Sequence, residues 1–130
     1  DRVNRIKSRE QWRPFAPSIT YESRNEYLKY GEYAPFMIVL DEVREEKQDV
    51  IPAVTHVDGT TRPQIVKQEV NPKFHRLLKV FEKRTGMPVL LNTSFNVSGE
   101  PIVESPQQAL ADFYTTELDA LAIGNHLLVK

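Results

Sequence analysis

Residues 71–96, NPKFHRLLKVFEKRTGMPVLLNTSFN, decide the fold class of this chain. Asn71 and Pro72 suit the N-cap and first turn of a helix, and Gly86 suits its C-terminal end. The residues between them place four apolar side chains on one helical face: Phe74, Leu77, Leu78 and Phe81. Residues 87–91 are apolar and predict a buried strand. A helix that leads directly into a buried strand indicates an α/β protein.

The rest of the chain continues this alternation of strands and helices. Residues 36–40 are all apolar and predict a central strand. Asp58-Gly59 is a turn pair between two extended patterns, so residues 54–66 predict a β-hairpin. Ser105 has the spacing of a helix cap and predicts a second helix. Shorter segments complete the prediction: an extended, edge-strand segment at residues 13–18, a short helix at residues 22–30, and closing strands at residues 120–123 and 127–129.

Composition narrows the class of protein. With 130 residues, of which 40% are hydrophobic, the chain is long enough for one domain with its own core. The absence of cysteine excludes disulfides, thiolate zinc sites and a cysteine nucleophile. No apolar run is long enough to span a membrane and no secretion leader is visible. We therefore expect a soluble, cytoplasmic protein with no membrane partner.

Charge is spread unevenly along the chain. The net charge of −1 argues against a general nucleic-acid partner. The first 13 residues nevertheless hold five bases against two acids, a local charge of +3. The sequence also starts at Asp1 with residues that suit the tail of a helix already under way. We therefore expect a fragment of a longer protein, incomplete at its N-terminus.

A polar run follows the predicted strand at residues 87–91. It contains Asn92, Thr93, Ser94 and Asn96, and the loop after a strand of an open α/β sheet is a common place for a ligand. Hydroxyl and amide groups there can donate to phosphate or carbonyl oxygens. The alternative is that these side chains only make turns between two elements.

Four bases could supply the cations that an anion site needs: Lys7, Arg9, Arg13 and Arg62. For each base taken alone, the simpler interpretation is an exposed surface charge. His56 precedes the Asp58-Gly59 turn and leads toward Arg62, which makes it a candidate, although a structural histidine is the more common case. His75 is expected at the surface or boundary of its helix. The histidines are too scattered to predict a metal site.

Long blocks of this sequence resemble the C-terminal domain of the NodU/CmcH-type carbamoyltransferases, in the same order over nearly the whole chain. The blocks are KSREQWRPFAPS (residues 7–18), HVDGTTR (56–62), LLNTSFNVSGEPIV (90–103) and LDALAIG (118–124). The resemblance treats residues 1–130 as one domain. It implies a YrdC-like fold, a twisted open mixed sheet with helices packed on it. Members carry a Gly-Pro-Arg motif upstream of this start.

YrdC-like proteins have an active-site pattern that this chain shares. It consists of Lys-x-Arg early in the chain and Ser-x-Asn late, which correspond here to Lys7-x-Arg9 and Ser94-x-Asn96. The resemblance therefore implies catalytic roles for Lys7, Arg9, Arg62, Ser94 and Asn96. It also implies substrate-binding roles for Arg13, His56, Asn92 and Thr93.

The resemblance implies an enzyme that uses carbamoyl phosphate and ATP with Mg²⁺. The YrdC-like domain would form carbamoyladenylate, and an upstream Kae1-like domain of the same chain would pass the carbamoyl group to an acceptor hydroxyl. The fragment alone is expected to be inactive. Two alternatives stay open: a YrdC-like module that binds nucleotide or RNA without chemistry, and a module that only docks to the missing domain.

Overall fold

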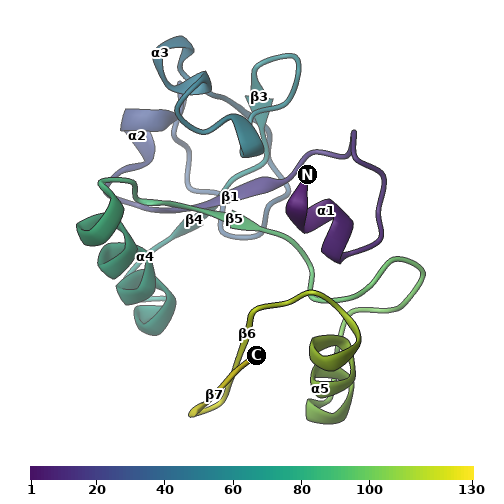
Figure 1. The fold of residues 1–130 in the computed structure, drawn as a ribbon. Helices are drawn as coiled ribbons and strands as arrows, with labels where there is room; N and C mark the ends of the chain where they lie inside the picture. The colour runs from purple at the N-terminus through teal and green to yellow at the C-terminus, as the bar shows by residue number, and fades with distance from the viewer. The chain divides into compact units, whose positions relative to one another are not determined.

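The computed structural model describes residues 1–130 and divides them into two compact units. The central unit is Pro14–Thr93, and the terminal unit combines Asp1–Arg13 with Ser94–Lys130. Both units mix helices with strands (Figure 1), and no sheet closes into a barrel. The predicted α/β class with an open mixed sheet is confirmed.

A mixed three-stranded sheet forms the core of the central unit. Its strands are β1 (Ala16–Thr20), β4 (Gln64–Val66) and β5 (Val89–Asn92), in the order β4-β1-β5. β1 runs parallel to β4 and antiparallel to β5. The strand predicted at residues 87–91 is confirmed as β5, shifted by a residue or two.

β1 is the middle strand, whereas its prolines predicted an edge strand. All five of its residues are buried. Pro17 lies opposite Leu91 of β5, but β4 pairs only with Ser18 through Thr20. Pro17 therefore lies beyond the ladder with β4, so its missing N–H breaks no hydrogen bond on that side.

Helix α4 (Pro72–Thr85) packs on β1 and β5 as the sequence predicts. The Asn71 side chain accepts a hydrogen bond from Phe74 N at 3.2 Å, and Gly86 ends the helix in the left-handed conformation at φ 76°. The buried face is rotated relative to the prediction, because Leu78 is fully buried and Leu77 is 53% exposed.

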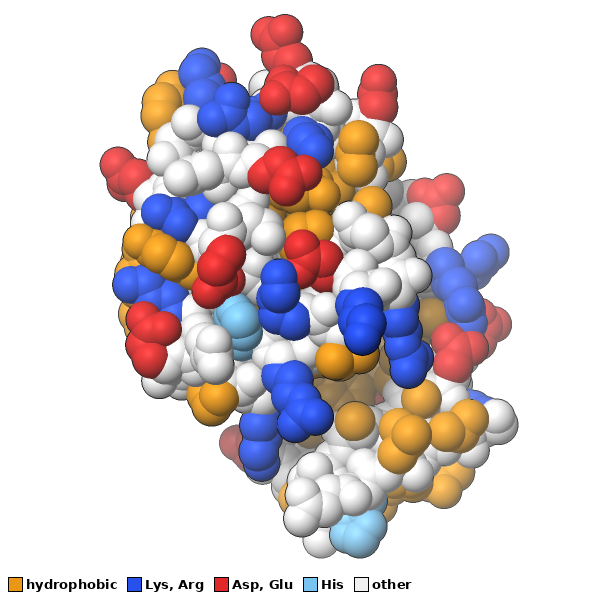
Figure 2. Space-filling view, turned by 90° about the vertical axis from the view of Figure 1, so that its left-hand side faces the viewer, with side chains coloured by type: hydrophobic (Ala, Val, Ile, Leu, Met, Phe, Trp, Pro, Cys, Tyr) orange, Lys and Arg blue, Asp and Glu red, His pale blue; other side chains and the backbone are white.

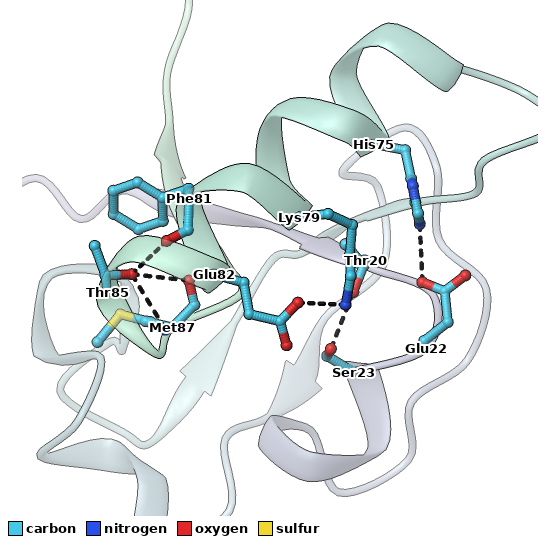
Figure 3. A network of polar contacts seen from close by, with 9 residues as sticks. All are labelled: Thr20, Glu22, Ser23, His75, Lys79, Phe81, Glu82, Thr85 and Met87. Carbon is cyan, nitrogen blue, oxygen red and sulfur yellow. Dashed lines mark hydrogen bonds and ion pairs between the residues drawn. The ribbon is translucent and has the colours of Figure 1, made fainter.

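His75 belongs to this buried face, so its predicted place at the surface is wrong. Only 7% of the residue is exposed, and its Nε2 lies 3.0 Å from Glu22 Oε2, at the end of β1 (Figure 3). The carboxylate gives the imidazole a polar partner, which is what permits its burial.

The outer side of α4 carries a concentration of positive charge. Five of its fourteen residues are Lys or Arg, against one Glu. Figure 2 looks onto the side of the molecule that bears α4 and shows basic side chains gathered there. The basic character of the chain is therefore not confined to its first residues.

The strand predicted at residues 36–40 is wrong. These residues form turns, with Phe36 76%, Ile38 80% and Leu40 63% exposed. Met37 adopts the left-handed conformation at φ 57°, which interrupts an extended backbone. In addition, Ile65 of β4 donates its N–H to Ala34 O at 2.9 Å, so β4 bonds the chain before this segment.

The predicted hairpin over residues 54–66 is also wrong. The first half contains a 3-10 helix, η1 (Pro52–Val54), and β3 (Thr60–Thr61) pairs with β2 (Asp41–Glu42) instead. Pro52 favours the helical turn because its ring fixes φ. The turn itself is confirmed, with Gly59 at φ 78°. Two further short helices lie in this unit: α2 (Arg24–Tyr27), within the predicted 22–30, and α3 (Glu45–Gln48).

The terminal unit contains α1 (Arg2–Ile6), α5 (Pro106–Thr115) and a hairpin of β6 (Ala120–Ile123) and β7 (His126–Val129). Ser105 caps α5 by accepting from Gln108 N, as its spacing predicts. Ala109 and Phe113 of α5 pack with Leu121 in a small apolar core. None of the helices is long and apolar enough to cross a membrane.

Candidate functional site

Lys7 joins the segment after α1 to the polar loop that begins at Ser94. Its Nζ donates to Ser94 O, to Asn96 O at 2.7 Å and to Asn96 Oδ1 at 3.1 Å. Its own backbone carbonyl accepts from Ser98 N at 2.9 Å. An ammonium group has three N–H donors, so this loop uses all of them. Lys7 therefore shapes the loop as well as bringing positive charge to it.

The side chains of Ser94 and Asn96 are hydrogen-bonded to each other. Ser94 Oγ donates to Asn96 Oδ1 at 2.6 Å, and Asn96 Nδ2 donates to Glu100 O at 2.9 Å. Because Asn96 Oδ1 also accepts from Lys7, the orientation of this amide is fixed. The structure thus brings together the two predicted pairs, Lys7-x-Arg9 and Ser94-x-Asn96, at Lys7.

A positive electrostatic field surrounds Lys7. Partial burial lowers the pKa of its ammonium, and the neighbouring charges of Arg9 and Arg13 lower it further, against an opposing effect of Asp112. Burial and then Arg13 likewise lower the pKa of Arg9, with Glu10 opposing. Arg13 Nη1 is 3.6 Å from Glu10 Oε2 in an exposed contact. Like charges that disfavour one another's charged form mark a place where a bound anion would be favourable.

Asp112 is a site residue that the sequence reading missed. It lies on α5, is only 7% exposed, and its Oδ2 is buried without a hydrogen-bond donor. A groove of about 320 Å³ runs beside it, lined by Glu100, Pro101, Val103, Gln108, Ala111 and Asp112. The signal in the sequence was a carboxylate three residues after Ala109, on the face of the helix that packs in the core.

Asn92 has a hydrogen-bonding role inside the sheet of the central unit. Its Nδ2 donates to Ser18 Oγ and to Gln64 Oε1, both at 2.9 Å, and Ser18 Oγ donates to Gln64 Oε1 at 2.8 Å. These three side chains come from β5, β1 and β4, so they connect all the strands of the sheet. Thr93 follows directly and is half-buried.

His56 and Arg62 flank the Asp58-Gly59 turn of the central unit. His56 Nδ1 lies 3.0 Å from Thr60 Oγ1, and that hydroxyl donates to Asp58 Oδ1 at 2.7 Å. The Thr60 hydroxyl proton is therefore directed at Asp58, which assigns the donor role to His56 Nδ1. Hydrogen bonds from Thr60 lower the pKa of Asp58. Arg62 is exposed.

The predicted residues thus fall into two sets. Lys7, Arg9, Arg13, Ser94 and Asn96 belong to the terminal unit. The central unit holds the rest: His56, Arg62, Asn92 and Thr93. No group of three or more His, Asp or Glu side chains in the chain could hold a metal ion.

Comparison with known proteins gives a match over the full length. The family model described as "Carbamoyltransferase C-terminus" matches residues 1–130. Nodulation protein NolNO of Sinorhizobium fredii is 47% identical over 134 residues, which cover 100% of this chain and 20% of that protein. The 3'-hydroxymethylcephem-O-carbamoyltransferase of Amycolatopsis lactamdurans is 42% identical over 103 residues, which cover 79% of this chain and 19% of that protein. The chain therefore spans about a fifth of the length of these relatives.

Proposed function

Because this chain belongs to the carbamoyltransferase C-terminus family, we propose that it is the part of an O-carbamoyltransferase that binds carbamoyl phosphate. In this proposal it uses ATP to form carbamoyladenylate and releases pyrophosphate. An upstream Kae1-like domain of the full-length protein then transfers the carbamoyl group to an acceptor hydroxyl. Related proteins named as O-carbamoyltransferases support the reaction class.

The convergence of three cations on one polar loop carries this proposal. Lys7, Arg9 and Arg13 are close enough to lower one another's pKa, and Lys7 contacts the loop that holds Ser94 and Asn96. A phosphate or acyl phosphate would relieve this charge repulsion. A set of unrelated surface bases would not gather around one hydrogen-bonded loop.

We assign roles by the chemistry of each group. Arg9 and Arg13 offer planar guanidinium groups to phosphate oxygens, and Lys7 adds charge while holding the loop. Ser94 and Asn96 orient the bound group, which keeps the reacting atoms aligned. In the central unit, Arg62 is proposed as a further phosphate contact, and His56, Asn92 and Thr93 as further substrate contacts.

ATP fits the basic character of this site, because its phosphates are the kind of anion that these cations bind. Mg²⁺ is different, since the chain has no cluster of carboxylates for it. Magnesium commonly binds through the phosphates of its nucleotide with only one or two protein carboxylates. We propose that Mg²⁺ arrives with ATP, and none of the roles assigned above depends on it.

The test is exchange of labelled pyrophosphate into ATP by the full-length protein, with and without carbamoyl phosphate. We expect Arg9→Ala to lower kcat/KM for carbamoyl phosphate about tenfold or more, because it removes a charge-assisted contact. The matched control is Arg5→Ala, an exposed base on α1, which should stay within about twofold of wild type. Exchange that is independent of carbamoyl phosphate would instead indicate a nucleotide-binding module. An unchanged Arg9→Ala variant would overturn the site.

A second candidate function, docking to the rest of a longer chain, has its own observation. Phe36, Ile38 and Leu40 expose most of their surface in the central unit. Contiguous exposed apolar residues mark an interaction surface. We propose that the remainder of the full-length protein, the Kae1-like domain included, covers them. Residues 1–130 alone would then lack turnover, and docking would add to the carbamoyl phosphate site without replacing it.

A further inference from the structure

Asp112 is a buried carboxylate without the donors that such a group normally has. It is 93% buried by the exposure given above, and Oδ2 has no hydrogen-bond partner. An ionised carboxylate removed from water is strongly destabilising unless it is paired or hydrogen-bonded. A chain that keeps such a group either pairs it with something absent from the folded protein or tolerates the cost.

The nearest cation does not pair with it. Asp112 acts on Lys7 through its charge, since it raises the pKa of that ammonium against the larger effect of burial. All three donors of Lys7 nevertheless point to Ser94 and Asn96. Asp112 and Lys7 therefore form a separated positive and negative pole within the terminal unit.

The groove beside Asp112 gives a ligand access to this pole. Asp112 is the one buried member of its lining, while Glu100, Gln108 and Ala111 are exposed. The loop that Lys7 organises ends at the same groove, because Asn96 Nδ2 donates to Glu100 O. The groove thus connects the acidic pole to the basic loop.

We propose that Asp112 binds the amino group of the carbamoyl donor, which rests on the function proposed above. Carbamoyl phosphate has an anionic phosphate at one end and an N–H₂ group at the other. The phosphate end suits Lys7, Arg9 and Arg13, and the N–H₂ end supplies the donor that Asp112 lacks. A site with both poles selects a carbamoyl group over acyl groups that have no N–H.

Acetyl phosphate is the probe that isolates this contact. It has the same planar acyl phosphate, with a methyl group in place of N–H₂. We would measure the dissociation constants of carbamoyl phosphate, acetyl phosphate and inorganic phosphate for the full-length protein by calorimetry. The expected result for wild type is that carbamoyl phosphate binds about tenfold or more tightly than acetyl phosphate, as a hydrogen bond to a charged acceptor requires.

Two substitutions test the residue itself. Asp112→Ala should bring the ratio of the two constants close to one, and Asp112→Asn, which keeps an acceptor but no charge, should bring it partway. Both should leave inorganic phosphate binding within about twofold. The matched control is Glu117→Gln, an exposed acid of the same unit, which should keep the wild-type ratio.

The outcomes separate this inference from the function on which it rests. Equal binding of the two acyl phosphates by wild type, or variants that keep the wild-type ratio, would overturn the role of Asp112 while the carbamoyl phosphate site stands. A purely structural Asp112 would weaken all three ligands equally and leave the ratio unchanged. Failure of wild type to bind any of the three would overturn the proposed function as well.

Discussion

Lys7 and Asn96 are 89 positions apart in the chain and are joined by hydrogen bonds from one ammonium group to both the backbone and the side-chain oxygen of Asn96. The contact places the two ends of the terminal unit, the segment after α1 and the polar loop, in one structure. It also explains why a lysine suits this position. Three rotatable donors on one nitrogen can reach three converging oxygens, whereas the planar fork of arginine cannot.

Lys7→Met should release the loop. We expect faster amide hydrogen exchange at residues 94–98, because the methionine removes the three hydrogen bonds of Nζ, and we expect more than a tenfold loss of carbamoyl-dependent exchange activity. Lys7→Arg should keep the charge without restoring loop protection. Arg5→Met serves as the control for changing a base in this segment. Unaltered protection of residues 94–98 in Lys7→Met would refute the organising role.

Asp112→Asn should stabilise the protein in the absence of ligand. Replacing a buried, unpaired carboxylate with a neutral amide removes a desolvation cost of about 1–3 kcal/mol. We expect a higher free energy of unfolding in urea and, if the further inference holds, a smaller thermal stabilisation by carbamoyl phosphate. Such opposite changes are typical of residues kept for function. A variant less stable than wild type would indicate that Asp112 is internally paired in solution.

The contact between Glu22 and His75 predicts a pH dependence of stability. Burial raises the pKa of Glu22, but the hydrogen bond and charge of His75, with smaller contributions from backbone and Lys79, bring it below the ordinary value. A carboxyl whose pKa is lower in the folded state stabilises the protein above its unfolded pKa. That contribution is lost as pH falls from the unfolded value through the folded one.

Glu22→Gln should therefore reduce the acid sensitivity of the central unit. The difference in unfolding free energy between wild type and this variant should be full near pH 6 and shrink toward zero below the folded pKa of Glu22. Urea titrations between pH 6 and pH 2 measure it. Glu69→Gln, an exposed acid of the same unit, is the control. A difference that grows on acidification would have the wrong sign.

The elements that could be predicted are those whose signals are local. α4 has its cap at Asn71 and its terminator at Gly86 within its own sequence, and its residues repeat with the helical period. The closing hairpin of β6 and β7 needs only a short turn between two apolar runs. In such segments the nearest neighbours along the chain determine the structure.

The predictions that failed depend on partners far away in the sequence. β1 occupies the centre of the sheet because β4 and β5 pair with its two edges, which no property of Pro17 reveals. Among the candidate site residues, Lys7 and Ser94 could be named from the motif they share with YrdC-like proteins. The unpaired state of Asp112 could not, because it depends on where Lys7 directs its donors.

Residues 36–40 give the last prediction, which tests the docking surface. Phe36→Ser combined with Ile38→Ser should lower the melting temperature of the full-length protein by several degrees, since each apolar side chain buried against another domain contributes about 1.5–3 kcal/mol. The same pair of substitutions should leave residues 1–130 alone nearly unchanged, because both side chains are exposed there. Val57→Ser, which removes a fully exposed apolar side chain from the same unit, is the control and should affect neither protein. Equal effects on both proteins would mean that these side chains support the fold of the central unit, and no effect on either would mean that nothing covers them.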